Sequence, residues 1–99
     1  MIVRIVKLTF DPLRTEEFES IFHATKIKIR NQPGCQHLEL LKDINQPNIY
    51  MTYSYWNEPQ DLENYRKSEL FKAVWQDTKA LFAGKPEAWS VNQEWISGK

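Results

Sequence analysis

The first ten residues, MIVRIVKLTF, are apolar at positions that would face both sides of a β-strand. Side chains alternate between the two faces of a strand. Val3 and Ile5 would therefore lie on one face. Val6 and Leu8 would lie on the other. A strand that is apolar on both faces is normally covered on both faces, so this segment predicts a strand inside a layered fold.

Helix caps, prolines and glycines divide the rest of the chain into helices and strands. Asp11 and Pro12 predict a helix that begins near Leu13. Pro33 and Gly34 mark the end of that helix. Apolar periodicity and turn residues then predict strands at 35–42 and 49–56, helices at 60–66 and 69–82, and a last strand at 88–96. The element order is β-α-β-β-α-β.

That order is typical of the ferredoxin-like α+β fold, in which two helices cover one face of a four-stranded antiparallel sheet. The opposite face of the sheet is then left open. Because the first, third and fourth strands are apolar on both faces, an open face would expose apolar side chains to water. A second copy of the same sheet is the simplest cover, so we expect a homodimer. We expect the 99 residues to form one domain, 1–99, without an internal boundary.

The charge balance argues against a general attraction to nucleic acid or to an anionic membrane. Thirteen Lys and Arg residues are matched by thirteen Asp and Glu residues, so the chain has no long-range field of one sign. The apolar N-terminal segment is too short to span a membrane, and Arg4 and Lys7 interrupt it. The single Cys35 allows no internal disulfide, and no side chains have the spacing of a zinc site. We therefore expect a cytoplasmic protein that binds no metal.

The segment from Tyr50 to Trp75 has a distinctive pattern. A strand ends in Trp56, a polar turn follows, and a short helix carries a leucine and an aromatic residue. Ser68 and Phe71 come next, before the aromatic residue at position 75. This pattern resembles the antibiotic biosynthesis monooxygenase family, and the resemblance extends over essentially the whole chain.

The resemblance implies a fold and a function. Members of this family form dimers whose sheets join into an α+β barrel, with a pocket between the sheet and the helices of each protomer. Several members oxidise quinols, polyketide-like aromatics or haem with molecular oxygen, without a flavin or a metal held by the apoprotein. Others have no known activity. The function implied for this chain is a cofactor-independent monooxygenase that acts on an electron-rich aromatic, such as a quinol or a polyketide-like phenol.

Two other functions remain open on the sequence alone. The chain could be a non-catalytic dimeric module that binds a small molecule, since no residue pair in it is a catalytic signature. It could also handle haem. However, haem-degrading relatives carry the iron-binding histidine at the position of Trp75 and an asparagine near that of Val6. An indole nitrogen has no free lone pair for iron, so the sequence argues against haem ligation by Trp75.

Trp56 and Trp75 are the candidate substrate-binding residues, and Tyr65 is a candidate catalytic residue. The resemblance places Trp56 at the wall of the pocket, where its indole could stack on a flat substrate. Plain core packing is the alternative for Trp56. Relatives carry a pocket-facing ring at the position of Tyr65, so its phenol could hydrogen-bond a substrate oxygen. Alternatively, Tyr65 is a helix residue with a solvated hydroxyl. We expect Trp56 and Tyr65 to converge on one pocket.

His37 and Arg4 are the other candidate catalytic residues. His37 shares one parity of its strand with Cys35 and Glu39. His37 and Glu39 could therefore meet as a base and its orienting carboxylate, or as an ion pair at the surface or dimer interface. Arg4 lies among apolar residues, where a charge is costly unless it is paired or opens into a cavity. It could pair with Glu39 or Glu94, or it could anchor a substrate oxyanion.

Overall fold

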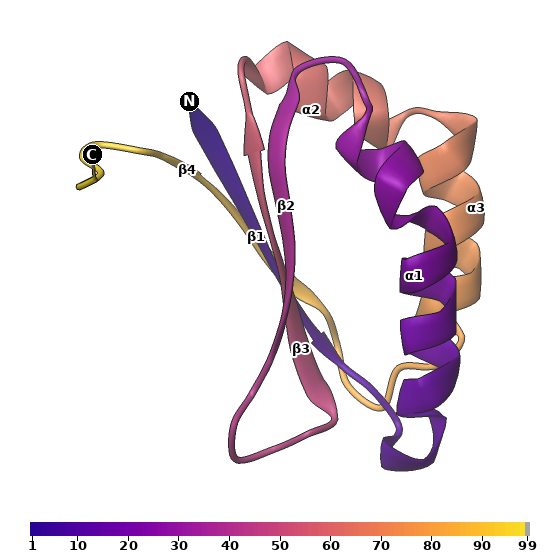
Figure 1. Cartoon of the computed structure of the whole chain (residues 1–99). Helices are drawn as coiled ribbons and strands as arrows, with labels where there is room; N and C mark the ends of the chain where they lie inside the picture. Colours follow the sequence, from indigo (N-terminus) through magenta and orange to yellow (C-terminus); the bar gives the residue numbers. More distant parts are fainter. Residues whose placement is uncertain (99) are drawn as a thin grey trace.

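A four-stranded antiparallel sheet is covered on one face by helices (Figure 1). This arrangement is that of a computed structural model, which describes residues 1–98. Within that range the strand order is β2-β3-β1-β4, and no helix is long and apolar enough to cross a membrane. The predicted ferredoxin-like α+β fold is confirmed. The elements are β1 (Ile2–Thr9), a short 3-10 helix η1 (Pro12–Arg14), α1 (Thr15–Arg30), β2 (Cys35–Lys42), β3 (Ile49–Trp56), α2 (Pro59–Arg66), α3 (Glu69–Lys79) and β4 (Glu87–Asn92).

Both long helices have boundaries that differ from the prediction. The Asp11 side chain accepts a hydrogen bond from the Leu13 amide at 2.9 Å. This capped turn forms η1, and α1 begins only after it. α3 ends at Lys79, before the predicted boundary. It ends there because the chain beyond it turns back, so that Phe82 forms a β-bridge with Phe10.

The last strand is also shorter than predicted and ends at Asn92. Asn92 pairs with Ile2, the first residue of β1, which is the neighbour of β4 in the sheet. Beyond Asn92, the Gln93 amide still donates a hydrogen bond to the Met1 carbonyl at 3.1 Å, and no residue of β1 remains to pair with residues 94–96. As a result, the Trp95 side chain is 81% exposed and Ile96 is 59% exposed.

The strand register decides which side chains face the helices. Arg4 on β1 lies opposite Ser54 on β3 and Ser90 on β4. Directly paired residues in neighbouring strands point to the same side of a sheet, so these three share a face. Val6 and Leu8 lie on that same face and pack in the core beneath the helices. The odd-numbered residues of β1 point to the opposite, open face.

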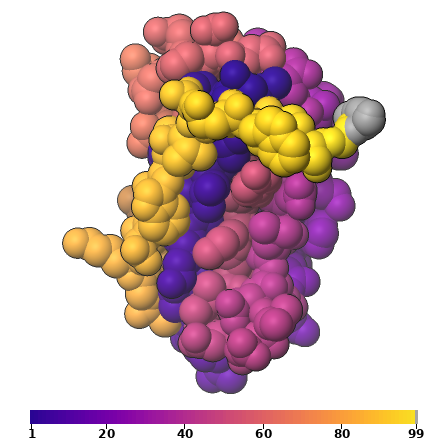
Figure 2. Space-filling model, turned by 90° about the vertical axis from the view of Figure 1, so that its left-hand side faces the viewer, coloured from indigo at the N-terminus to yellow at the C-terminus, as the bar shows by residue number. Residues whose placement is uncertain are grey.

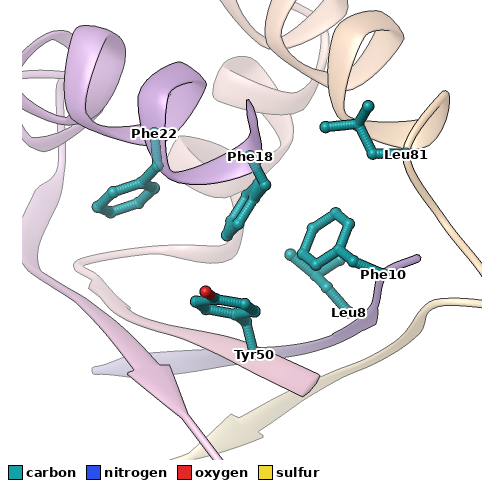
Figure 3. Packing of buried hydrophobic residues seen from close by; sticks show 6 residues of the cluster. All are labelled: Leu8, Phe10, Phe18, Phe22, Tyr50 and Leu81. Carbon is teal, nitrogen blue, oxygen red and sulfur yellow. The ribbon is translucent and has the colours of Figure 1, made fainter. Parts of the chain in front are cut away.

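Aromatic rings dominate the core between the sheet and the helices (Figure 3). Its buried members are Leu8, Phe10, Phe18, Phe22, Tyr50 and Leu81. The rings of Phe10 and Phe18 stack with centroids 4.2 Å apart, and both meet Tyr50 edge-on. The Tyr50 hydroxyl donates a hydrogen bond to Glu19 on α1. These contacts fix α1 on β1 and β3.

A close approach at Gly34 positions α2 against the sheet. Gly34 has a φ of 86°, and a Cβ atom there would lie 2.3 Å from Cγ of Asp61. Only glycine tolerates both conditions. The Gly34 carbonyl also accepts a hydrogen bond from the Asn57 amide at 2.9 Å. These contacts hold α2 beside the end of β3, where Leu62 packs with Trp56 in a second buried cluster.

Within residues 1–98, no helix covers the other face of the sheet (Figure 2). In this view β4, β1, β3 and β2 run side by side, and the C-terminal residues cross over the start of β1. Trp89 and Val91 on β4 are each 44% exposed, and Leu41 on β2 is 41% exposed. Tyr53 and Tyr55 on β3 share this face. The described part of the chain thus leaves an apolar and aromatic surface in contact with solvent.

Candidate active-site pocket

The helix-covered face of the sheet and the helices enclose a pocket of about 320 Å³. This volume is at the lower end of the range for small-molecule sites, roughly 300–1,000 Å³. Buried aromatic residues line its inner part, namely Phe18, Phe22 and Trp56. Arg66, which is exposed, lies where the pocket meets solvent. The pocket therefore combines a largely apolar interior with a polar edge, which suits a small flat molecule.

Trp56 and Tyr65 lie side by side in this pocket. Their rings stack with centroids 5.3 Å apart and an interplanar angle of 19°. Trp56 is only 1% exposed, and its Nε1 donates a hydrogen bond to Ser54 Oγ at 3.0 Å. The turn that joins β3 to α2 is short, so the strand end and the helix face one another. The expected convergence of these two side chains is observed.

An aromatic wall continues from Tyr65 along α3. The ring of Phe71 meets Tyr65 edge-on, with centroids 5.2 Å apart. It also stacks on Trp75 at 5.9 Å with an interplanar angle of 8°. Trp75 lines the pocket and is half-buried. Phe71 belongs to the pattern that resembles the family, but it was not predicted as a site residue, because its spacing is that of an ordinary apolar helix face.

Burial controls the protonation of Tyr65. It raises the pKa of the phenol to about 12, with a smaller electrostatic contribution from the nearby Cys35. The Tyr65 hydroxyl therefore keeps its proton throughout the neutral pH range. In that range it can donate a hydrogen bond to a bound molecule, but it is a poor general base.

Arg4 projects from β1 into the same pocket. The side chain is half-buried, and its Nη1 donates a hydrogen bond to Ser90 Oγ at 2.9 Å. Within residues 1–98, Arg4 forms no ion pair with a carboxylate. Of the two interpretations of Arg4, an ion pair with Glu39 or Glu94 is therefore wrong. Glu39 instead contacts His37 on the open face, so it cannot reach Arg4 through the sheet.

A second guanidinium adds to the positive charge at the pocket. Arg66, in the last turn of α2, lines the pocket and forms a 3.0 Å ion pair with Glu63. Burial lowers the pKa of Arg4, the charge of Arg66 lowers it further, and Glu63 partly offsets these effects. An arginine keeps its charge at neutral pH despite such shifts. Arg66 was not predicted as a site residue, because an exposed arginine at the end of a helix has an ordinary structural explanation.

His37 does not enter the pocket. A β-bulge between Cys35 and His37 shifts the register of β2. Cys35 therefore packs with Trp56 on the helix side, whereas His37 lies opposite Tyr55 on the open face. Its Nε2 lies 2.5 Å from Oε2 of Glu39, so the two residues do meet, but on the wrong face for the pocket. Within residues 1–98, no group of three or more His, Cys, Asp or Glu side chains is placed to hold a metal ion.

Thr78 contributes an unpaired polar atom to the pocket. It lines the cavity and is only 3% exposed, yet its Oγ1 has no hydrogen-bond partner within residues 1–98. Thr25 on α1, by contrast, donates to the Ile21 carbonyl at 2.8 Å. Buried polar atoms nearly always have a partner, so Oγ1 of Thr78 is available to a water molecule or ligand. Nothing in the sequence indicates this unpaired hydroxyl, because Thr78 lies among the apolar residues of one face of α3.

Comparison with known proteins agrees with this fold. The sequence model of the antibiotic biosynthesis monooxygenase family matches residues 1–77. A Caulobacter crescentus structure named "putative antibiotic biosynthesis monooxygenase" has a TM-score of 0.88 and 22% identity, covering 93% of this chain and 88% of that one. A structure of the same name from Nitrosomonas europaea has a TM-score of 0.89 and 15% identity, covering 96% and 100%. A conserved protein from Methanosarcina mazei has a TM-score of 0.88 and 17% identity, covering 95% and 94%. No curated protein matches the chain.

Replacing Thr78 with valine should stabilise the protein in the absence of ligand. The change keeps the side-chain shape and removes a hydroxyl that is buried without a partner, so the free energy of unfolding should rise by about 1 kcal/mol. Urea denaturation measures this change. Thr25→Val is the matched control, because it removes a bonded hydroxyl and should leave stability unchanged or lower it by up to about 1 kcal/mol. Destabilisation of Thr78→Val would show that Oγ1 has a partner in solution.

Proposed function

The chain belongs to the antibiotic biosynthesis monooxygenase family, and on that premise we propose that it is a cofactor-independent monooxygenase. Its substrates would be molecular oxygen and an electron-rich aromatic, such as a quinol or a polyketide-like phenol. One observation carries this proposal. Stacked aromatic rings, a neutral phenol and a guanidinium face the same pocket.

The proposed reaction needs no cofactor because the substrate supplies the electrons. Once the phenol has lost its proton, the ring passes electrons to oxygen, and a ring carbon forms a bond to one oxygen atom. The O–O bond then breaks, while the same ring carbon gives up its hydrogen as a proton. One oxygen atom stays on the ring as a carbonyl, and the other leaves as water. A phenol and O₂ thus give a quinone and water.

Arg4 and Tyr65 are the proposed catalytic residues, and both would act on charge. The guanidinium of Arg4 can stabilise the negative charge of the phenolate. The hydroxyl of Tyr65, which stays protonated because its pKa is about 12, can donate a hydrogen bond to a substrate oxygen. Trp56 and Trp75 would bind the flat ring and exclude water from it.

Proton removal is assigned to solvent rather than to a side chain. Within residues 1–98, no His, Asp or Glu side chain lines the pocket. His37, the base suggested by the sequence, has no support from its position on the opposite face of the sheet. A nearby cation favours the ionised form of an acid, so Arg4 would lower the pKa of the bound phenol. The substrate could then lose its proton to water.

A homodimer is part of the proposal. The exposed aromatic and apolar side chains on the open face support it, including Trp89, Val91 and Leu41. A second copy packed on this face would bury on the order of 2,000 Å² in total, as in an obligate dimer. Such packing would join the two sheets into the α+β barrel that the family resemblance implies.

Two alternative functions make different predictions. A non-catalytic binding module is favoured by the lack of a His, Asp or Glu side chain along the pocket within residues 1–98. Haem handling would need an iron ligand, but the described pocket offers no imidazole, and Tyr65 retains its proton. Oxygen uptake in the presence of a quinol or an anthrone separates the enzyme from the binding module. A haem titration followed at the Soret band tests the third function.

Replacing Tyr65 with phenylalanine should slow oxygen consumption by about tenfold or more. The change keeps the ring and removes only the hydroxyl, and a factor of ten corresponds to about 1.4 kcal/mol of lost transition-state stabilisation. Tyr53→Phe is the matched control, because it makes the same change on the open face. Its rate should match that of the wild type. Wild-type turnover in a folded Tyr65→Phe protein would remove this hydroxyl from the mechanism.

The pH dependence of oxygen uptake should follow the substrate rather than a histidine. Tyr65 donates only while protonated, and its pKa is raised to about 12, so its donor role is lost only as pH approaches that value. The rate should therefore rise as the substrate phenol ionises, without an inflection near the usual histidine pKa of about 6.5. His37→Gln should leave this profile unchanged. An inflection that disappears in His37→Gln would return the histidine to the mechanism.

Trp89→Glu should dissociate the proposed dimer. Trp89 is 44% exposed on the open face, and a carboxylate placed in an apolar interface is strongly disfavoured. Leu13→Glu is the matched control, because Leu13 is 93% exposed in η1, which leads directly into α1 on the helix-covered side of the sheet. It should leave the mass unchanged. Sedimentation at micromolar concentration reports the mass, and a wild-type protein found only as an 11.8 kDa species would contradict the proposal.

A further inference from the structure

Two arginines from separate elements approach each other at the pocket. Arg4 comes from the inner strand β1, Arg66 comes from the last turn of α2, and both line the cavity. Arg66 is paired with Glu63 at 3.0 Å. Within residues 1–98, the side-chain hydrogen bond of Arg4 goes to the neutral Ser90 Oγ. No carboxylate of the described chain therefore pairs directly with the charge of Arg4.

This arrangement is unfavourable without a bound anion. Like charges repel, and a partly buried cation loses part of its hydration. Both effects lower the pKa of Arg4. An anion between the two guanidinium groups would replace one repulsion with two attractions. A carboxylate is well suited to this position, because its two oxygens can accept paired hydrogen bonds from one guanidinium.

The pocket walls beside the arginines suit a flat apolar body. Trp56 and Tyr65 present stacked rings, and Phe71 and Trp75 continue the aromatic surface along α3. Aromatic rings bind other flat rings by offset stacking or edge contacts. The cavity volume of about 320 Å³ favours a small ring system over a large polycycle.

A second polar contact is available farther along the pocket. Arg4 and Leu8 both line the pocket. Their backbones lie four residues apart on β1, or roughly 13 Å along the strand, so Leu8 marks the end of the pocket away from Arg4. The carbonyl of Thr78 accepts a hydrogen bond from Leu81, which packs in the same cluster as Leu8. The Thr78 Oγ1 atom is buried and has no partner within residues 1–98. A hydroxyl or carbonyl at the far end of a ligand could bond to it.

We propose that the pocket selects planar aromatic acids, whose carboxylate binds between Arg4 and Arg66. The ring of the ligand lies against Trp56 and Tyr65, and a polar substituent reaches Thr78. This inference rests on the proposed function and deepens it, because it names the substrate class as an electron-rich aromatic that carries a carboxylate. A neutral aromatic of the same size lacks the charge contact and binds more weakly.

Binding of 2-naphthoate and 2-naphthamide to the full chain tests this selection without turnover. The two probes share one ring system and differ in charge. Calorimetry should show that 2-naphthoate binds about tenfold or more tightly than 2-naphthamide, a difference of about 1.4 kcal/mol. Equal binding of the two probes, or binding of neither, overturns the proposal.

Variants that remove one positive charge then show which arginine produces the preference for 2-naphthoate. Arg4→Gln should weaken 2-naphthoate binding by about tenfold and leave 2-naphthamide binding unchanged, whereas Arg4→Lys should keep part of the preference, because it retains the charge but not the paired hydrogen bonds. Arg66→Gln, at an exposed position, should reduce the preference by a smaller factor. Lys72→Gln is the matched control, because it removes an exposed positive charge from α3 outside the pocket. It should leave the preference unchanged.

The outcomes separate this inference from the proposed function. If Arg4→Gln weakens both probes equally while remaining folded by circular dichroism, the inference is overturned. If Arg4→Gln does not fold, an undiminished preference in Arg66→Gln overturns it. Charge-selective binding without oxygen uptake on a hydroxynaphthoate supports the inference and refutes the monooxygenase. Oxygen uptake with a neutral quinol, together with equal binding of the charged and neutral probes, supports the monooxygenase and refutes the inference.

Discussion

β1 is the strand on which the rest of the structure depends, because it pairs along both edges and its two faces meet different surroundings. Leu8 packs in the aromatic core between the sheet and the helices. Arg4, on the same face, enters the pocket. Val3 faces the open side, where the C-terminal residues cross the start of β1, and is only 4% exposed. The alternation of side chains along β1 thus directs Leu8 to the core, Arg4 to the pocket and Val3 to the open face. A register shift of one residue would move each of these side chains to the opposite face of the sheet.

The chemistry of the pocket follows largely from burial. Removal from water disfavours the charged form of an ionisable group. Burial therefore raises the pKa of Tyr65 to about 12 and lowers the pKa of Arg4. Tyr65 remains neutral as a result, whereas Arg4 keeps its charge, because the ordinary pKa of arginine is far above neutrality. The same physical cause leaves one neutral donor and one cation, and neither is a base. For this reason the proposed mechanism relies on the acidity of the substrate.

Local patterns were sufficient to predict the order of the elements, because caps, prolines and alternation act over a few residues. The convergence of Trp56 and Tyr65 on one pocket was predictable too, since a short turn joins their strand and helix. The position of His37 was not, because the bulge in β2 breaks its parity with Cys35. Thr78 was missed for a different reason. A threonine within an apolar stripe looks like core, and only the arrangement of residues 1–98 reveals that its Oγ1 has no partner.

The pocket and the open face are opposite sides of the same strands. On β3, Tyr55 points to the open face, while the adjacent Trp56 forms the inner wall of the pocket. Val3 and Arg4 have the same relation on β1. A second copy packed on the open face would therefore hold the backbone that positions Trp56 and Arg4. A chain of this length buries only roughly 60–65% of its surface on folding, so burial at a dimer interface would add a large share of stability. The proposed dimer and the proposed binding site are thus coupled through the strands they share, without any residue having to contact both the ligand and the partner.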